Sequence, residues 1–144
     1  MSFAKALPPP DAPRIVRQAA CSCGSLQASV QGEALRISIC HCLACQRRTG
    51  SVFGMQARFA RSDVSIQGAW RSWRRIGDSG SAIDFHFCPL CSATLFYICE
   101  EQPEVIAIPV GAFADPDFPP PRVSVYEERK HAWVGLPPEI ERES

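Results

Sequence analysis

Cysteines constrain this chain more than any other feature of its sequence. Eight occur in 144 residues, and seven of them lie in three short groups: Cys21-Ser22-Cys23, Cys40-His41-Cys42-Leu43-Ala44-Cys45 and Cys88-Pro89-Leu90-Cys91. Cysteines two or three residues apart can direct their thiolates at one metal ion, whereas C-x-C pairs are poorly placed to form a disulfide with each other. The spacing therefore predicts metal sites, and zinc is a metal that thiolate ligands bind well.

The rest of the sequence supports reduced thiols over disulfides. Residues 1–13 include three consecutive prolines but no apolar segment typical of an export signal, and no apolar run approaches membrane-spanning length. Because thiols stay reduced in the cytoplasm, we expect a cytoplasmic, metal-binding protein. The formal net charge is zero, so no global electrostatic attraction to nucleic acid or to a membrane is expected.

The first and third cysteine groups predict a closed site. Residues i and i+2 of an extended chain point to the same side, so Cys21 and Cys23 can bind one ion. The C-x-x-C knuckle of Cys88 and Cys91 curls around a metal in a different way and completes a tetrahedron. We expect these four residues to hold a structural zinc whose binding free energy contributes directly to folding.

The middle group predicts an open site. Cys40, Cys42 and Cys45 supply three thiolates within six residues, and three protein ligands leave the fourth position of zinc free, as in catalytic sites. Three negative thiolates make the metal a weak Lewis acid, which suits thiol chemistry better than water activation. We therefore expect a catalytic zinc at these three cysteines.

Histidines leave an alternative open at this second site. One of them can close it and make it structural; the candidates are His41, His86 and His131. His41 lies between two ligands on an extended segment, so we expect its ring to point away from the metal. Cys99 has no partner at a metal-ligand spacing, and we expect a buried, inert thiol.

Alternating hydrophobicity predicts a mainly β, antiparallel fold. Apolar residues at every second position indicate half-buried strands over 26–31, 35–39, 53–59 and 83–87, with another strand over 105–110. Helical signal is limited to Leu43–Arg48, before Gly50. Length and composition predict one domain over 14–137, a flexible proline-rich tail over 1–13 and a C-terminal tail over 138–144.

Together, these motifs resemble the glutathione-dependent formaldehyde-activating enzyme (GFA) family, whose domain is shared with the centromere protein V group. The resemblance spans nearly the whole globular part. Its carriers are Cys21-Ser22-Cys23-Gly24, the run from Cys40 to Cys45 with Gln46-Arg47-Arg48-Thr49-Gly50-Ser51, Phe87-Cys88-Pro89-Leu90-Cys91, Ile108-Pro109-Val110-Gly111-Ala112-Phe113, Asp115-Pro116 and His131-Ala132-Trp133-Val134-Gly135-Leu136-Pro137.

The resemblance implies a single-domain zinc-binding β-tent (Mss4-like) fold and two zinc ions per chain. It also implies S-(hydroxymethyl)glutathione synthase activity, formally a carbon–sulfur lyase in reverse, in which a small thiol such as glutathione adds to formaldehyde or another aldehyde. A non-catalytic, zinc-stabilised binding module is the rival hypothesis, because fold does not fix function. One departure from the family is Ser92, where glycine is usual; a serine strains a left-handed position.

Arginines are the candidate substrate contacts. Arg47 and Arg48 follow the open-site cysteines and can bind the carboxylates of glutathione, although a solvated helix face is the alternative. A second group of basic and aromatic residues fits a weak nucleic-acid patch, because aromatic rings stack on bases and arginines neutralise phosphates. This group consists of Trp70, Arg71, Trp73, Arg74 and Arg75. The zero net charge and the strand-like spacing argue against nucleic acid, and we expect the two tryptophans to contribute to packing.

Overall fold

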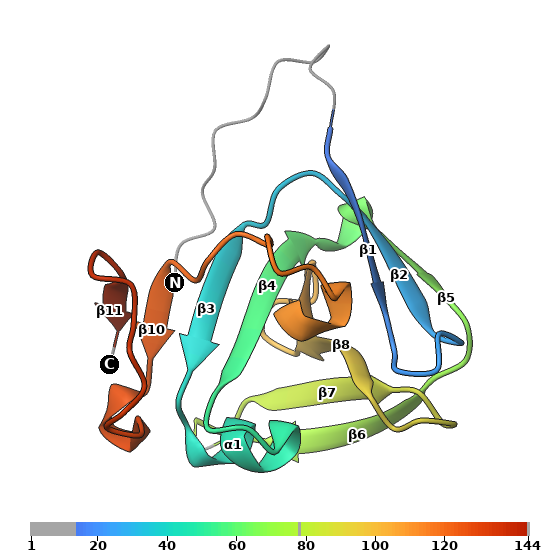
Figure 1. Cartoon of the computed structure of the whole chain (residues 1–144). Helices are drawn as coiled ribbons and strands as arrows, with labels where there is room; N and C mark the ends of the chain where they lie inside the picture. The colour runs from blue at the N-terminus through green and yellow to red at the C-terminus, as the bar shows by residue number, and fades with distance from the viewer. Residues whose placement is uncertain (1–13, 78, 144) are drawn as a thin grey trace.

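The computed structural model describes residues 14–77 and 79–143 and contains two β-sheets and one short α-helix (Figure 1). The mainly β prediction is confirmed. The proline-rich tail expected over 1–13 lies outside the described residues. Within those residues, no helix is long and apolar enough to cross a membrane.

The smaller sheet has three antiparallel strands in the order β1-β2-β5. Its strands are β1 (Val16–Ala20), β2 (Gln27–Gln31) and β5 (Val64–Gln67). Ala28 and Val30 are fully buried while their neighbours along β2 are not, as an alternating pattern predicts.

The larger sheet has eight strands in the order β11-β10-β3-β4-β9-β8-β7-β6. They are β3 (Arg36–Cys40), β4 (Gly54–Ala60), β6 (Arg71–Ile76), β7 (Ala82–Phe87), β8 (Thr94–Cys99), β9 (Val105–Pro109), β10 (Val123–Val125) and β11 (Glu141–Glu143). Pairing is antiparallel from β3 to β6, as expected, but β10 runs parallel to both of its neighbours. Residues 138–144, expected as a tail, thus include an edge strand.

The helix α1 (Leu43–Thr49) lies where the sequence predicts it. It begins after Cys42, whose sulfur accepts a hydrogen bond from the Cys45 N–H at 3.3 Å. It ends at Gly50, which has a left-handed φ of 74° that glycine adopts without strain. Three 3-10 turns complete the secondary structure of the described residues: η1 (Arg61–Asp63), η2 (Val110–Phe113) and η3 (Glu127–Arg129).

The main core combines side chains from both sheets. Leu26 and Val30 of the smaller sheet's hairpin and Phe59 and Ile108 of the larger sheet belong to one buried cluster. A second cluster of Phe85, Tyr97 and Ala107, with Ile83 packed against it, belongs to the opposite face of the larger sheet, because neighbouring strand residues point to opposite faces. The larger sheet therefore carries apolar contacts on both faces.

The prediction that residues 35–39 form a half-buried strand is right about the strand and wrong about its burial. Every residue of β3 is buried, including Arg36 and Ser38. The guanidinium of Arg36 donates two hydrogen bonds to Glu143, and the hydroxyl of Ser38 accepts hydrogen bonds from Gln56 and Arg58. These hydrogen bonds offset most of the cost of burying polar side chains, although Arg36 Nε and Gln56 Oε1 have no hydrogen-bond partner among the described residues.

Candidate metal centres

Four cysteines from two distant turns form what we call the four-cysteine centre. Cys21 and Cys23 lie in the turn between β1 and β2, and Cys88 and Cys91 lie in the turn between β7 and β8. Their sulfur atoms all lie within 4.8 Å of one another. The centre therefore connects a hairpin of the smaller sheet to a hairpin of the larger one.

The spacing of these sulfurs fits a tetrahedral thiolate site. Sulfurs bound to zinc at about 2.3 Å and at tetrahedral angles lie about 3.8 Å apart. The Sγ atom of Cys23 lies 3.7 Å from that of Cys21 and 3.7 Å from that of Cys88. A metal ion can thus bind here without a rearrangement of the two turns.

Nearby donors stabilise thiolates in this centre. Burial opposes ionisation of Cys21, but hydrogen bonds from the Leu26 N–H and from the neighbouring thiols outweigh it and lower its pKa to about 6. The hydroxyl of Ser25, 3.2 Å from the Cys88 sulfur, is the main reason that the pKa of Cys88 is lowered. Thiolates are the form that a metal requires, so the surroundings of Cys21 and Cys88 favour metal binding.

Ser92 keeps the left-handed conformation expected of glycine in this knuckle. Its φ is 66°, and its N–H donates to the Cys88 carbonyl at 2.9 Å. The knuckle is therefore kept, with a serine Cβ in a conformation that L-residues adopt at a cost.

Cys40, Cys42 and Cys45 form the three-cysteine centre, and their sulfurs also lie within 4.8 Å of one another. Cys40 ends β3, where it is paired with Gly54 of β4. Cys42 caps α1, and Cys45 lies in the first turn of that helix. Cys40 and Cys45 are buried and Cys42 is partly exposed, so solvent reaches the centre beside Cys42.

The electrostatics of the three-cysteine centre favour a bound cation. A hydrogen bond from Cys40 is the largest of the effects that lower the pKa of Cys42 to about 2, and the same contact raises the pKa of Cys40. The pKa of Cys45 is also raised: its hydrogen bond with Cys40 acts against this, but the contact with Cys42 and burial outweigh it. Three sulfurs this close cannot all ionise alone because like charges repel, and a soft divalent cation such as zinc removes that obstacle.

The histidines form other contacts. His41 is fully buried, its Nε2 lies 3.0 Å from the Ser124 hydroxyl, and burial lowers its pKa. His86 pairs with Ser72 and His131 with Gln46. Within the described residues, both groups able to hold a metal consist of cysteines alone, so the geometry gives no support to a histidine that closes the second site.

The two candidate substrate arginines have different surroundings. Arg47 is exposed, whereas Arg48 is half-buried with its guanidinium 4.9 Å from the ring centre of Phe85. A Cβ on Gly54 would lie 3.5 Å from Arg48 Nη2 and 3.7 Å from Cys45 Sγ, so these two atoms are neighbours. Of the pair, Arg48 is the arginine beside the three-cysteine centre.

Sequence reasoning missed a third arginine near this centre. The guanidinium of Arg75, on β6, lies 5.0 Å from the ring centre of Phe85, and its charge favours the Cys42 thiolate. The strand pairing that aligns Trp73 with Phe85, and Phe85 with Tyr97, brings β6 close to α1. The only signal in the sequence is that Arg75 and Trp73 are two residues apart and share a strand face.

The tryptophans and Arg74 do not form a free basic patch. Trp73 stacks on Phe85 at 5.9 Å, and Trp70 meets Phe96 edge-on at 5.5 Å, although both tryptophans remain about half exposed. The guanidinium of Arg74 donates two hydrogen bonds to Asp84, which neutralises its charge.

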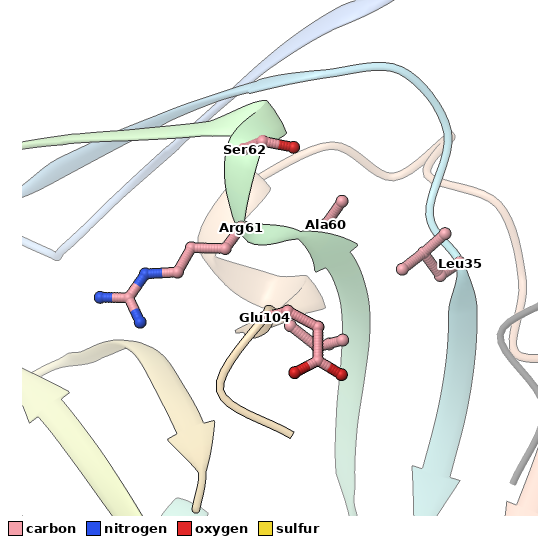
Figure 2. A pocket seen from close by; sticks show the side chains of 6 residues that line it. Leu35, Ala60, Arg61, Ser62 and Glu104 are labelled. Atoms are coloured by element: carbon pink, nitrogen blue, oxygen red, sulfur yellow. The ribbon is translucent and has the colours of Figure 1, made fainter.

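A surface hollow of about 510 Å³ lies elsewhere (Figure 2). It is lined by Leu35, Ala60, Arg61, Ser62, Glu104 and Val105. Ala60 ends β4, whose first residue, Gly54, adjoins the three-cysteine centre. The hollow therefore lies at the opposite end of this strand from the cysteines, and the side chains of Arg61 and Glu104 point apart in it. No metal-ligand cluster is associated with it within the described part of the chain.

Comparison with known proteins gives one family and one informative structure. The family model described as glutathione-dependent formaldehyde-activating enzyme matches residues 16–129. A crystal structure of a Rhodobacter sphaeroides protein, a Northeast Structural Genomics target, has a TM-score of 0.53 and 22% sequence identity, and the match covers 72% of this chain and 91% of that one. It shows a shared fold, in agreement with the expected β-tent. No curated protein sequence matches the chain.

Proposed function

The chain belongs to the glutathione-dependent formaldehyde-activating enzyme family, and from this premise we propose that it joins a small thiol to an aldehyde at the three-cysteine centre. In this reaction the S–H bond of the thiol breaks and a carbon–sulfur bond forms at the carbonyl carbon. The carbonyl oxygen takes up a proton, so the product is a hydroxyalkyl thioether. No oxidant or reductant is consumed.

The observation that carries the proposal is a group of three sulfurs with a partly exposed member. Cys40, Cys42 and Cys45 would hold one zinc ion, and the four-cysteine centre of Cys21, Cys23, Cys88 and Cys91 would hold a second. When bound by three thiolates, zinc lowers the pKa of a thiol that joins it and leaves that sulfur nucleophilic.

The chain's own residues have separate roles in this proposal. A hydrogen bond between the Ser124 hydroxyl and His41 Nε2 fixes the His41 ring, and the Gln46 side chain donates to the His41 carbonyl at 2.9 Å, so the segment between Cys40 and Cys42 is held in place. The His41 ring is fully buried, so it does not relay a proton to solvent. We assign a substrate contact to Arg48, beside Cys45, and a more distant one to exposed Arg47.

Cobalt substitution tests this function directly. Cobalt bound by thiolates absorbs light through its sulfur ligands, so glutathione that enters the three-cysteine centre should change the spectrum. In the zinc-loaded protein, formaldehyde should then consume glutathione thiol faster than it does in buffer, and Cys42→Ser should abolish both effects. Cys99→Ser, which removes a cysteine outside both centres, is the matched control.

The outcome that favours the rival hypothesis is equally clear. A cobalt spectrum that does not respond to glutathione or to other small thiols, together with thiol consumption at the buffer rate, would leave the binding module as the better account.

A further inference from the structure

Two arginines contact the same aromatic ring, and one of them, Arg48, lies beside the three-cysteine centre. The guanidinium carbon of Arg48 lies 4.9 Å from the ring centre of Phe85, and that of Arg75 lies 5.0 Å from it. Arg48 comes from α1 and Arg75 from β6, so tertiary structure alone brings them together. The two guanidinium groups give the surroundings of this ring a positive charge, which attracts anions.

Neither guanidinium has a carboxylate partner. Within residues 14–77 and 79–143, the arginines that form ion pairs are Arg14, Arg17, Arg36, Arg74 and Arg142. Contact with the negative face of the Phe85 ring offsets only part of the desolvation of Arg48 and Arg75.

Several of their N–H groups also lack an acceptor. The Nε of Arg48 and the Nε and Nη1 of Arg75 are buried and have no hydrogen-bond partner in the described part of the chain. Buried donors without acceptors are unfavourable, and native proteins seldom keep them unless a ligand or water satisfies them. Both side chains are only half-buried, so a ligand can approach them from solvent.

The position of this pair relates it to the sulfur chemistry. Arg48 Nη2 and Cys45 Sγ both lie within 3.7 Å of the point where a Cβ on Gly54 would be, and Arg75 contacts the same Phe85 ring as Arg48. A small molecule with its sulfur at the three-cysteine centre and an anionic group a few bonds away can therefore approach Arg48 and the ring that Arg48 shares with Arg75. Guanidinium groups bind carboxylates with paired, charge-assisted hydrogen bonds.

We propose that Arg48 and Arg75 form a carboxylate-binding subsite that makes the three-cysteine centre selective for thiols carrying a carboxylate. This inference rests on the proposed function for its sulfur-binding half, and it adds Arg75 as a residue that determines specificity. Arg75 is a binding residue here and takes no part in bond making.

The first test uses a ligand that lacks a free thiol. S-methylglutathione keeps the carboxylates of glutathione, so calorimetry with the metal-loaded protein measures the subsite without the addition reaction. Arg75→Gln should weaken its binding about tenfold, because a charge-assisted hydrogen-bonded pair is lost. Arg75→Lys should recover part of that loss. Arg74→Gln, the same change on the neighbouring residue of β6, should have little effect.

The second test compares thiols of similar size. The metal-loaded protein should bind mercaptoacetate at least about tenfold more tightly than the neutral 2-mercaptoethanol, and Arg75→Gln should remove that preference. Arg48→Gln should have a similar effect, and Arg74→Gln, whose arginine is paired with Asp84, should not.

The outcomes separate this inference from the proposed function. No binding of S-methylglutathione, equal binding by Arg75→Gln and the wild type, or no preference between the two thiols would overturn the subsite. If mercaptoacetate and the neutral 2-mercaptoethanol add to formaldehyde equally fast, the proposed function is supported and the subsite is excluded. If the charge preference is present but no addition to an aldehyde occurs, the subsite stands and the proposed reaction falls.

Discussion

The two cysteine centres use the same ligand type and differ in what they connect. The four-cysteine centre joins turns that lie 65 residues apart in the chain, from Cys23 to Cys88, and links the two sheets. The three-cysteine centre is complete within six residues, at one end of β3 and the start of α1. A metal that closes a long loop restricts the unfolded chain more than one that closes a short loop. The same chemistry should thus stabilise the fold at one centre and leave a site free for function at the other.

The largest expected effect tests this difference by removing one sulfur from each centre. Cys88→Ser should lower the free energy of unfolding by more than about 3 kcal/mol, because metal-binding energy is part of the folding energy. Cys42→Ser should cost less than half as much. Urea denaturation of both proteins, with Cys99→Ser as the control, measures the difference. Equal losses at Cys42 and Cys88 would mean that both centres are structural.

A chelator should remove the metal ions of the two centres at different rates. Fresh protein should contain about two zinc ions per chain, and a chelator should take the first from the three-cysteine centre, where Cys42 is partly exposed and a ligand position is open. Near-ultraviolet circular dichroism should change little until the second ion leaves. A single unfolding step that releases both ions together would contradict separate roles.

Gly68 offers a change that reaches only the four-cysteine centre. Its φ is 107°, and a Cβ there would lie 2.2 Å from the backbone oxygen of Ser25, whose hydroxyl contacts the sulfurs of Cys23 and Cys88. Gly68→Ala should therefore cost about 2–4 kcal/mol of stability. Thiol binding at the three-cysteine centre, measured on the folded variant, should be unchanged. Gly111→Ala is the control, since nothing lies within 4 Å of its added Cβ.

Ser92 allows a gain in stability at the same centre. Because its φ is 66°, Ser92→Gly should relieve the cost of the left-handed conformation and stabilise the protein by about 0.5–1 kcal/mol. Thermal unfolding measures the change. Ser92→Ala keeps the Cβ and removes the hydroxyl, so it should give no gain. If Ser92→Gly destabilises and Ser92→Ala does so equally, the hydroxyl contact to the Cys91 carbonyl matters more than backbone strain.

The smallest effect concerns the end of β3 away from Cys40. Hydrogen bonds from Arg36 hold the pKa of Glu143 below its usual range. A carboxyl group with a lowered folded-state pKa stabilises the fold above its unfolded pKa of about 4.3, and this stabilisation is lost as the pH falls through the folded value. The stability difference between wild type and Glu143→Gln should therefore be constant above about pH 5 and narrow as the pH falls from there through the folded-state pKa of Glu143. A difference independent of pH would exclude this ion pair as its cause.

Short sequence patterns were sufficient to predict several strands and the helix. Alternation predicted strands over 26–31, 35–39, 53–59 and 83–87, and the structure forms each of them within one residue of these bounds. The strand expected over 105–110 and the helical turns expected over Leu43–Arg48, before Gly50, are also present. The alternating pattern did not predict that Arg36 and Ser38 are buried, because their hydrogen-bond partners, Glu143 and Gln56, lie on other strands. It also gave no sign of the parallel strand β10, whose three residues are too few for a pattern.

By itself, the sequence determined the three local groups of cysteines, because ligand spacing within a group is a short-range property of the backbone. Cys40, Cys42 and Cys45 are neighbours in any fold that keeps their turn, and the C-x-C and C-x-x-C pairs were each recognisable alone. Only the tertiary structure decided what surrounds the three-cysteine centre. Arg75 reaches the ring of Phe85, which Arg48 also contacts, through the registers of β6, β7 and β8. Strand register depends on side-chain packing and turn geometry across the whole sheet, which no local pattern of residues specifies.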